Sequence, residues 1–194
     1  MTKKNFNTIS DVIYQHAGIV LKEIKEDMVY SRVSRRIRIT GSRGFDDYLK
    51  LALATGSDEF THFVNAITTN LTSFFRESHH FDFITQTALP GWKATPGRQR
   101  LRIWSAGSST GEEAYSIAMT LADQVPKNWD TKILATDVDT DVVAQGDSGI
   151  YTQERINGLS KSLVTQHFDK VKVDGAQRVQ VKKHLRDMAF FKPL

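Results

Sequence analysis

The sequence is 194 residues long, which is enough for one ordinary domain or two small ones. Its 40% hydrophobic and 25% charged residues are typical of a soluble globular protein, and its formal net charge of +4 permits an acidic partner without requiring one. The absence of cysteine excludes disulfides, zinc–thiolate sites and cysteine nucleophiles, and it fits a reducing compartment. No apolar run is long enough to span a bilayer, and we find no signal peptide at the N-terminus.

Residues 1–69 predict a small domain of short helices. Apolar residues recur at helical spacing in four segments, and no segment alternates as a strand does. Gly41 and Gly44 mark the end of the second helix, and Ser57 could cap the fourth. The four apolar stripes are Ile9, Val12, Ile13 and Ala17; Val29, Tyr30, Val33 and Ile37; Phe45, Tyr48, Leu49 and Ala52; and Phe60, Phe63, Val64 and Ile67.

The second of these helices carries a row of arginines on the face opposite its apolar stripe. The row consists of Arg32, Arg35, Arg36 and Arg38, with no acid among them, and Arg43 follows in the loop. A charged helix face is usually just a solvated face. A purely cationic face favours an acidic surface or a nucleic acid as partner.

Residues 70–98 predict a connecting helix and a linker. The helix would run from about Thr72 to Ile84 and end before Pro90. Thr72, or the serine after it, could cap this helix, with Glu77 in its first turn.

Arg76 is the candidate for chemistry in this segment. Its guanidinium can hold a carboxylate with two parallel hydrogen bonds and so orient it. His79 and His80 are adjacent on the predicted helix, and adjacent side chains on a helix face different ways. We therefore expect no metal site there and interpret the two histidines as surface or packing residues.

Residues 99–194 predict alternating strands and helices. Buried strands at 101–106 and 133–136 flank a helix that begins at Gly111, with apolar residues at offsets of three, four and seven. Such a βαβ unit implies parallel strands and a right-handed crossover. A further apolar run at 188–191 predicts a third strand.

A hairpin interrupts this alternation. Apolar and polar residues alternate on both sides of Asp174-Gly175, which is a strong hairpin signal. We therefore predict a β-subdomain at about 168–185.

The turn at 105–113, between the first strand and the next helix, is the sharpest motif. Its Gly-x-x-x-Gly spacing, at Gly107 and Gly111, differs from the dinucleotide fingerprint, and the lysine of a Walker loop is missing. The glycines let the backbone turn tightly and approach a ligand closely. Glu112 and Glu113 suit a helix N-terminus and favour a cation, such as a sulfonium with an α-amino group, over phosphate. The alternative is a tight turn with two solvated glutamates.

Asp137 stands at the end of the second strand. An acid at this position can accept hydrogen bonds from both hydroxyls of a ribose. Alternatively, Asp137 caps the next helix. The neighbouring glycine turn favours the ribose interpretation.

Three motifs resemble those of the CheR-type chemoreceptor glutamate methyltransferases in sequence, order and spacing. The likeness extends over the whole chain, including the helical front, the segment at 149–151 and the hairpin. Ala114 and Ser108 are small departures, since many members carry proline at the first and some carry cysteine at the second. The motifs are Thr72-Ser73-Phe74-Phe75-Arg76-Glu77, Ser105-Ala106-Gly107-Ser108-Ser109-Thr110-Gly111-Glu112-Glu113-Ala114-Tyr115-Ser116 and Ala135-Thr136-Asp137-Val138-Asp139.

The resemblance implies an α/β fold. A small all-helical N-terminal domain would precede a class I, Rossmann-like methyltransferase domain with an inserted antiparallel β-subdomain. S-adenosylmethionine would be the methyl donor, S-adenosylhomocysteine the product and glutamate side chains of chemoreceptors the acceptors, giving glutamyl methyl esters in chemotaxis adaptation. We expect a cytoplasmic enzyme, monomeric at full length, whose partner is the cytoplasmic domain of a methyl-accepting chemoreceptor, with no nucleic acid and no membrane insertion.

The resemblance also implies roles for single residues. Arg76 would sit beside the methyl group as the catalytic residue, Glu112 or Glu113 would bind the amino-acid or ribose portion of the donor, and Asp137 would take its adenosine side. The arginine row would face the acidic methylation region of the receptor, and the hairpin would be the module that tethers some members to a receptor tail. The cofactor-binding residues would be Asn70, Thr72, Arg76, Gly107, Glu112, Glu113 and Asp137, and the substrate-binding residues Arg32, Arg35, Arg36 and Arg38.

Family members continue past residue 194 with further strands. We therefore expect a domain that is incomplete here, with its first strand as an exposed apolar edge. Two alternatives to the enzyme stay open. One is a non-catalytic receptor-binding fragment. The other is a nucleic-acid methyltransferase, which the arginine row suggests but which would need an aromatic pocket for a flipped base.

Overall fold

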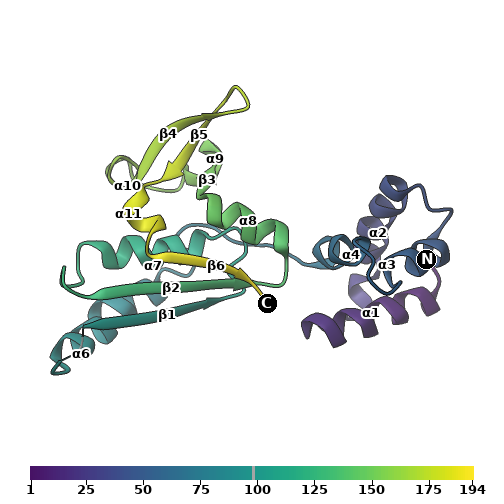
Figure 1. Ribbon diagram of the computed structural model, residues 1–194, viewed down its shortest axis with the longest axis horizontal. Helices are drawn as coiled ribbons and strands as arrows, with labels where there is room; N and C mark the ends of the chain where they lie inside the picture. Colours follow the sequence, from purple (N-terminus) through teal and green to yellow (C-terminus); the bar gives the residue numbers. More distant parts are fainter. Residues whose placement is uncertain (98) are drawn as a thin grey trace. The chain divides into compact units, whose positions relative to one another are not determined.

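The computed structural model describes residues 1–97 and 99–194, and the chain divides into two compact units, Met1–Thr69 and Asn70–Leu194 (Figure 1). Each unit has a hydrophobic core of its own. Among the described residues, no helix is both long enough and apolar enough to cross a membrane.

The first unit is entirely helical, as the apolar stripes predict. Helix α1 starts with a capping box between Thr2 and Asn5, and both α1 and α2 end at a left-handed glycine, Gly18 and Gly41. The predicted cap by Ser57 is wrong, because α4 follows Asp58 without a side-chain capping bond. The elements are α1 (Lys3–Ala17), the 3₁₀ turn η1 (Glu23–Lys25), α2 (Glu26–Thr40), α3 (Phe45–Ala52) and α4 (Glu59–Ile67).

The core of the first unit consists of one side of each helix. Tyr30, predicted to belong to the apolar stripe of α2, is instead half exposed and stacks on Phe45 with ring centroids 5.5 Å apart. Each buried aliphatic or aromatic side chain contributes roughly 1.5–3 kcal/mol to folding. The fully buried residues include Ile9, Ile13, Val29, Val33, Tyr48 and Phe63.

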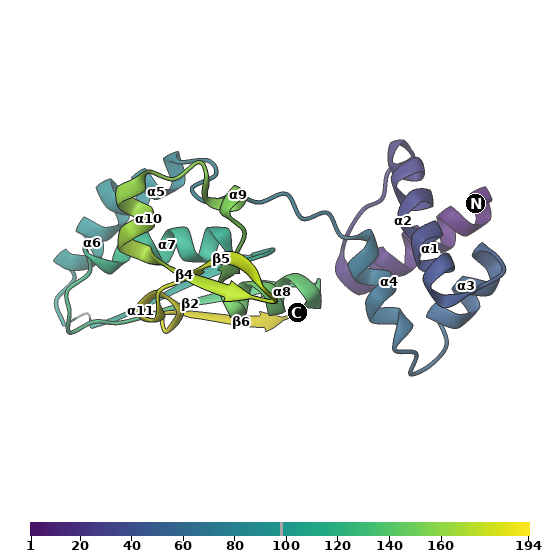
Figure 2. The same cartoon turned by 90° about the horizontal axis from the view of Figure 1, so that it is seen from above.

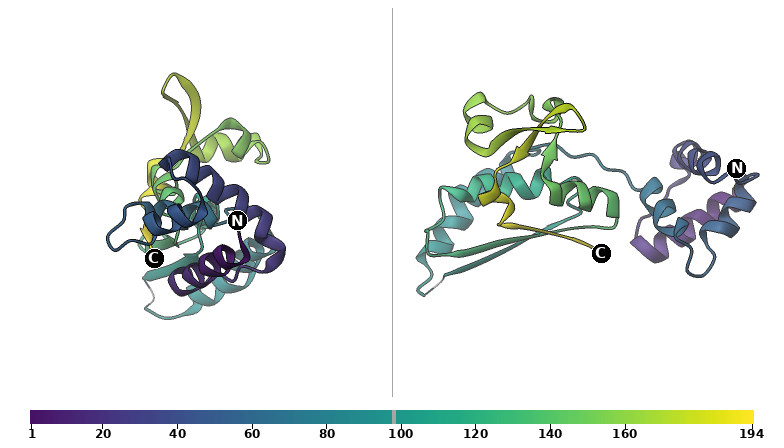
Figure 3. Two further views of the ribbon diagram at one scale, coloured as in Figure 1. Left: turned by 90° about the vertical axis from the view of Figure 1, so that its right-hand side faces the viewer. Right: turned by 45° about the horizontal axis from the view of Figure 1, so that its top comes forward.

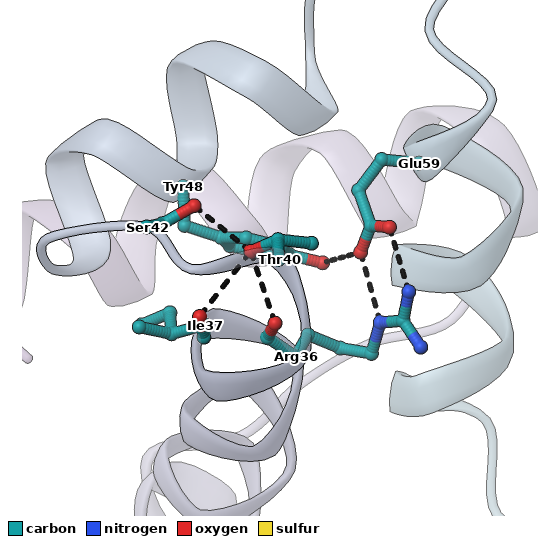
Figure 4. A network of polar contacts seen from close by, with 6 residues as sticks. All are labelled: Arg36, Ile37, Thr40, Ser42, Tyr48 and Glu59. Carbon is teal, nitrogen blue, oxygen red and sulfur yellow. Dashed lines mark hydrogen bonds and ion pairs between the residues drawn. The ribbon is translucent and has the colours of Figure 1, made fainter.

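A polar network joins α2, α3 and α4 at the edge of this core (Figure 4). The carboxylate of Glu59 accepts two hydrogen bonds from Arg36, at 2.9 Å from Nε and 2.6 Å from Nη2, and one from the Tyr48 hydroxyl at 2.8 Å. The side chains of Arg36 and Glu59 are only 18% and 10% exposed. Burial raises the pKa of Tyr48, so its hydroxyl remains a proton donor.

The second unit contains the predicted parallel sheet. Its strands are β1 (Arg100–Ala106), β2 (Asp130–Asp137) and β6 (Ala189–Pro193), in the order β1-β2-β6. Helix α7 (Glu112–Ala122) connects the first two strands. The βαβ unit, the third strand and the edge position of β1 are thus confirmed.

The two faces of this sheet differ. Leu101, Ile133 and Phe191 are buried on the face that packs against α7. The other face presents a row of large apolar side chains in register, Trp104, Leu134 and Phe190, which are 62%, 42% and 44% exposed.

A second, antiparallel sheet lies on the helix-covered side of the first, beyond α7 (Figure 3). It has the strand order β3-β5-β4, and the turn between β4 and β5 is formed by Asp174 and Gly175 at φ 51° and 77°. Two successive positive φ angles are typical of a type I′ turn, one of the two common two-residue hairpin connections, so the predicted hairpin is confirmed. The elements are β3 (Ile150–Tyr151), β4 (Phe168–Val173) and β5 (Ala176–Val181), with the helices α8 (Thr140–Ser148), α9 (Gln153–Ile156), α10 (Lys161–His167) and α11 (Lys183–Arg186) around them.

The helix predicted at residues 72–84 has different bounds. It is α5 (His79–Phe83), a π-helical turn η2 (Ile84–Ala88) and α6 (Leu89–Ala94), one helical run that continues through Pro90 (Figure 2). The π turn closes with a hydrogen bond from the Leu89 N–H to the Ile84 carbonyl. Pro90 follows directly after this π turn, where the i→i−4 hydrogen-bond pattern is already interrupted.

Candidate functional site

The loop between β1 and α7 is fixed to the end of β2 by its own backbone. The N–H groups of Gly107 and Ser108 both donate to the Thr136 carbonyl, at 2.9 and 2.8 Å. The Ser109 N–H donates to Asp137 Oδ2 at 2.8 Å, with Ser109 itself at φ 48°. These bonds hold the loop above the carboxyl ends of two parallel strands, where open α/β sheets bind their ligands.

The two glycines of this loop serve different purposes. Gly107 is exposed at φ 72°, and no described atom lies within 4 Å of the place where a Cβ would stand. A Cβ on Gly111 would lie 2.8 Å from Phe191 Cζ and 3.1 Å from Gly146 Cα. Gly107 therefore leaves room for a ligand, whereas Gly111 is needed for packing.

Buried polar atoms without hydrogen-bond partners cluster in this loop and at the start of α7. Among the described residues, five buried side-chain oxygens and nitrogens lack a hydrogen-bond partner, and three of them are Ser108 Oγ, Ser109 Oγ and Glu112 Oε1. Buried polar atoms are normally paired, so this cluster is suited to a polar ligand. The Glu112 side chain is fully buried, and its Oε2 accepts a hydrogen bond from the Thr110 hydroxyl at 2.6 Å. The alternative of two solvated glutamates is therefore wrong for Glu112.

Glu113 has a different environment from its neighbour. It is exposed, and its Oε1 accepts a hydrogen bond from the hydroxyl of Ser105, at the end of β1, at 2.7 Å. The two carboxylates of the motif thus divide into an enclosed one and a surface one.

Asp137 is buried beside the loop, with each carboxylate oxygen accepting one backbone hydrogen bond. Oδ2 bonds the Ser109 N–H, and Oδ1 bonds the Asp139 N–H at 3.0 Å. A carboxylate oxygen can accept more than one hydrogen bond, so this residue could also bind hydroxyl groups. The cap of α8 is Asp139, which accepts from the N–H groups of Asp141 and Val142, so the alternative of Asp137 as a helix cap is wrong.

Asn70 and Thr72 lie against these residues in the second unit. Asn70 Nδ2 donates to Asp139 Oδ2 at 2.8 Å, and the Thr72 carbonyl accepts from Arg155 Nη1 at 3.2 Å. The same Nη1 lies 3.5 Å from Glu112 Oε1. Arg155, on α9, is absent from the sequence-based site, because no local pattern connects it to a glutamate on another helix.

An aromatic cluster anchors the segment that follows Thr72. The ring of Phe74 packs edge-on against Tyr151 and Phe168, with centroids 5.0 and 5.5 Å away. The Tyr151 hydroxyl donates to the Thr110 carbonyl at 2.7 Å, and burial raises the pKa of Tyr151 so that this proton is retained. The cluster thereby fixes residues on both sides of the candidate site, and Tyr151 is a second contributor without a sequence-based role.

Arg76 lies on an exposed turn rather than on a helix. Phe75 and Glu77, on either side of it, have φ of 53° and 54°, which is unfavourable for residues other than glycine. The Phe75 N–H donates to the Ser116 hydroxyl at 2.9 Å, and Arg76 Nη1 donates to the Leu71 carbonyl at 2.8 Å. The predicted helix cap at Thr72 or Ser73 is therefore wrong, since long-range contacts of the loop take its place.

The arginines of α2 do not form one exposed face. Arg32 Nη1 donates to the carbonyls of Ile67 at 3.0 Å and of Thr68, at the C-terminal end of α4, and Arg36 is paired with Glu59. Arg35 and Arg38 are exposed. The prediction of a purely cationic face is thus wrong for Arg32 and Arg36, and it holds for the other two.

Comparison with known proteins agrees with this division of the chain. Residues 4–68 match the family model "CheR methyltransferase, all-alpha domain", and residues 70–194 match "CheR methyltransferase, SAM binding domain". The chain is 41% identical over 198 residues to a chemotaxis protein methyltransferase of Escherichia coli, and 40% identical over 198 residues to one of Salmonella typhimurium. A chemotaxis protein methyltransferase of Borreliella burgdorferi is 36% identical over 203 residues.

These alignments cover 100%, 98% and 100% of the chain, but 66%, 65% and 70% of the three relatives. The chain thus spans about two thirds of the length of the curated relatives it matches. S-adenosylmethionine is the cofactor of the matched domain. The chain belongs to the CheR methyltransferase family.

Proposed function

We propose that the second unit binds S-adenosylmethionine and that the whole protein methylates glutamate side chains of chemoreceptors, giving glutamyl methyl esters. The observation that carries this proposal is the cluster of buried oxygens without hydrogen-bond partners on Ser108, Ser109 and Glu112, at the junction of α7 with a loop above two parallel strands. One of them, Glu112 Oε1, also lies 3.5 Å from Arg155 Nη1. The matched domain is a SAM-binding domain, and the relatives are named chemotaxis protein methyltransferases.

The residues present fit this cofactor, which supplies a methyl group on a positively charged sulfur. Glu112 Oε1 is buried and accepts no hydrogen bond from the protein, so it would accept one from the α-ammonium group of the cofactor. We assign this role to Glu112 rather than to Glu113 because Glu113 is exposed and already bonded to Ser105. Asp137 would accept the ribose hydroxyls, and the open side of Gly107 would leave space for the cofactor chain.

The rest of the site would hold the cofactor and the acceptor in line. Asn70 and Thr72 would border the cofactor, since both are bonded to residues around the glycine loop. The acceptor carboxylate is ionised at neutral pH and needs no general base. Arg76, with its side chain exposed, would grip that carboxylate and orient it toward the methyl group.

The test is calorimetric titration of S-adenosylhomocysteine into this chain and into a version extended to the length of its relatives. Binding by the extended version supports the cofactor site, and binding by neither refutes it. Glu112→Gln should weaken binding at least tenfold, whereas Glu113→Gln should change it little.

Arg76 is tested separately by turnover with a receptor cytoplasmic domain. Arg76→Ala in the extended version should abolish methyl transfer while leaving the affinity for S-adenosylhomocysteine within about twofold. Arg76→Lys, which keeps the charge but loses the planar pair of donors, should also be strongly impaired. If Arg76→Ala retains most of the rate, Arg76 does not orient the acceptor.

A second candidate function is receptor binding without catalysis, in which Arg35 and Arg38 dock on an acidic region. Because these two side chains are exposed, receptor docking could be a role of the first unit in addition to catalysis by the second. Replacing both arginines with glutamate should weaken receptor binding and reduce its dependence on salt.

Receptor binding by a chain that binds no S-adenosylhomocysteine would support a binding module alone. Salt-dependent binding to oligonucleotides would instead support a nucleic-acid methyltransferase. A cytoplasmic, monomeric enzyme remains our expectation for the full-length protein.

A further inference from the structure

We propose that Glu77, His79 and His80 form a binding site for a transition-metal ion of the Zn²⁺ class. One carboxylate oxygen and one ring nitrogen from each histidine all lie within 4.8 Å of one another. His80 Nε2 is 3.8 Å from Glu77 Oε2, and the two imidazole rings are 4.2 Å apart between centroids. The prediction that the two histidines point apart is therefore wrong.

The backbone explains why three residues so close in sequence converge. Glu77 adopts a left-handed conformation, φ 54°, just before α5, and its carbonyl accepts a hydrogen bond from the His80 N–H at 3.0 Å. This turn carries the carboxylate back over the first residues of the helix, where His79 begins α5. A regular helix through residues 77–80 would keep Glu77 and His80 on one face but would turn His79 to the opposite side from Glu77.

The ligand set selects the class of ion. Imidazole nitrogens with a carboxylate oxygen suit Zn²⁺, Cu²⁺ and Ni²⁺, whereas Mg²⁺ and Ca²⁺ prefer oxygen ligands alone. In a tetrahedral zinc site with bonds of about 2.0–2.1 Å, the ligand atoms are roughly 3.4 Å apart. The ligand atoms must therefore close by up to about 1.4 Å, which their exposure permits. Three protein ligands would leave one position for water.

Two further features of the molecule support a single site of this kind. The chain has six histidines and no cysteine, so no thiolate competes for the ion. Within residues 1–97 and 99–194, this is the one group of three metal-ligating side chains that converges in this way. The neighbouring cation, Arg76, opposes metal binding by charge, but its guanidinium is turned toward the Leu71 carbonyl.

An ion at this site would clamp Glu77 to the start of α5 and thereby restrain the turn that carries Arg76. Zinc should therefore slow amide hydrogen exchange in a peptide covering residues 71–79, and leave exchange in α2 unchanged. This consequence does not depend on methyl transfer or on cofactor binding.

The experiment is calorimetric titration of ZnCl₂ into the untagged 194-residue chain. We expect one ion per chain, and a loss of affinity of about tenfold or more in both His79→Ala and Glu77→Gln, since even changes around a metal ligand cost 10–100-fold. His62→Ala, which removes an exposed histidine from α4, is the matched control and should bind as the parent does. MgCl₂ should show no binding.

Titration with Co²⁺ provides a second readout, because a three-ligand site with one water gives a much stronger visible band than hexahydrated cobalt. If His79→Ala disturbs α5, the variant His80→Gln tests the site instead, because His80 is exposed and glutamine is similar in size. Circular dichroism of each variant checks the fold. Zinc binding that is equal in the parent and in both His79→Ala and His80→Gln would overturn the proposal, as would the absence of a one-to-one complex.

Discussion

The network of Arg36, Glu59 and Tyr48 allows a quantitative test of what holds the first unit together. Replacing Glu59 with glutamine removes the negative charge and leaves the guanidinium of Arg36, 18% exposed, without its counter-charge. Removing one partner costs about 3–5 kcal/mol for a buried ion pair and about 0–1 kcal/mol for a surface pair. The exposures of 18% and 10% place this pair between these limits, nearer the buried one. We therefore expect a loss of about 2–3 kcal/mol, because glutamine can still accept the Tyr48 hydrogen bond.

The distribution of tryptophan makes this loss measurable within the whole chain. Trp92, Trp104 and Trp129 all lie in the second unit, so fluorescence reports that unit alone, whereas far-ultraviolet circular dichroism reports both. In urea, with a slope of about 1 kcal/mol per molar for a domain of this size, Glu59→Gln should lower the dichroism midpoint of the first unit by about 2–3 M. The fluorescence midpoint should not move.

The matched control is Arg35→Ala, one residue before Arg36 and exposed, which should cost less than about 0.5 kcal/mol. The double variant Arg36→Met, Glu59→Gln should recover part of the loss, since no unpaired charge remains. A shift below about 0.5 kcal/mol for Glu59→Gln, or an equal shift for Arg35→Ala, would refute the argument that the pair behaves as a buried one.

Three other contacts of the molecule can be tested by substitution. Burial raises the pKa of Glu59, but hydrogen bonds from Arg36 and Tyr48 lower it by more, so the pKa lies below its usual 4.5. The first unit should therefore lose stability as pH falls through this lowered pKa. Glu59→Gln should flatten the pH dependence of stability, measured by urea titration at several pH values. Gly111→Ala would push a Cβ into Phe191 and should destabilise the second unit by at least about 2 kcal/mol. Gly107→Ala meets only the cost of a left-handed backbone conformation and should destabilise it by about 1–2 kcal/mol. Tryptophan fluorescence in urea measures both losses, and equal losses would contradict the packing role of Gly111. Arg155→Ala should weaken S-adenosylhomocysteine binding about fivefold in the extended version, a loss of about 1 kcal/mol, because Thr72 and Glu112 lose the side chain that contacts both. Unchanged affinity in calorimetry would show that Arg155 does not support the site.

The fold of the second unit follows from local patterns to a large extent. Buried apolar runs predict β1, β2 and β6, and Asp174-Gly175 predicts the hairpin because few other pairs tolerate two positive φ angles. Periodicity likewise predicts the helices of the first unit. These signals are local, and the packing of the chain agrees with them.

Local patterns fail where a distant contact takes over. Thr72 and Glu77 have the spacing of a helix start, but Phe74 packs against Phe168 and the Phe75 N–H bonds Ser116, so the segment forms a strained turn instead. No pattern around Arg36 reveals that Glu59 will pair with it across two helices. The sequence thus predicts the glycine loop and the place of Asp137 at the end of β2. The contacts of Arg155 and Tyr151 and the conformation of Arg76 depend on tertiary structure.

The ring of Phe191 has a consequence for the order in which the molecule assembles. It lies where a Cβ of either Gly111 or Gly146 would stand, so one side chain from β6 sets the spacing between the start of α7 and the middle of α8. During synthesis, β1, α7, β2 and α8 all emerge long before residue 191, and the pairing of β6 with β2 closes a long stretch of chain. We therefore expect the glycine loop to reach its final shape only once β6 has paired with β2, so that a change at Phe191 should lower ligand affinity together with stability.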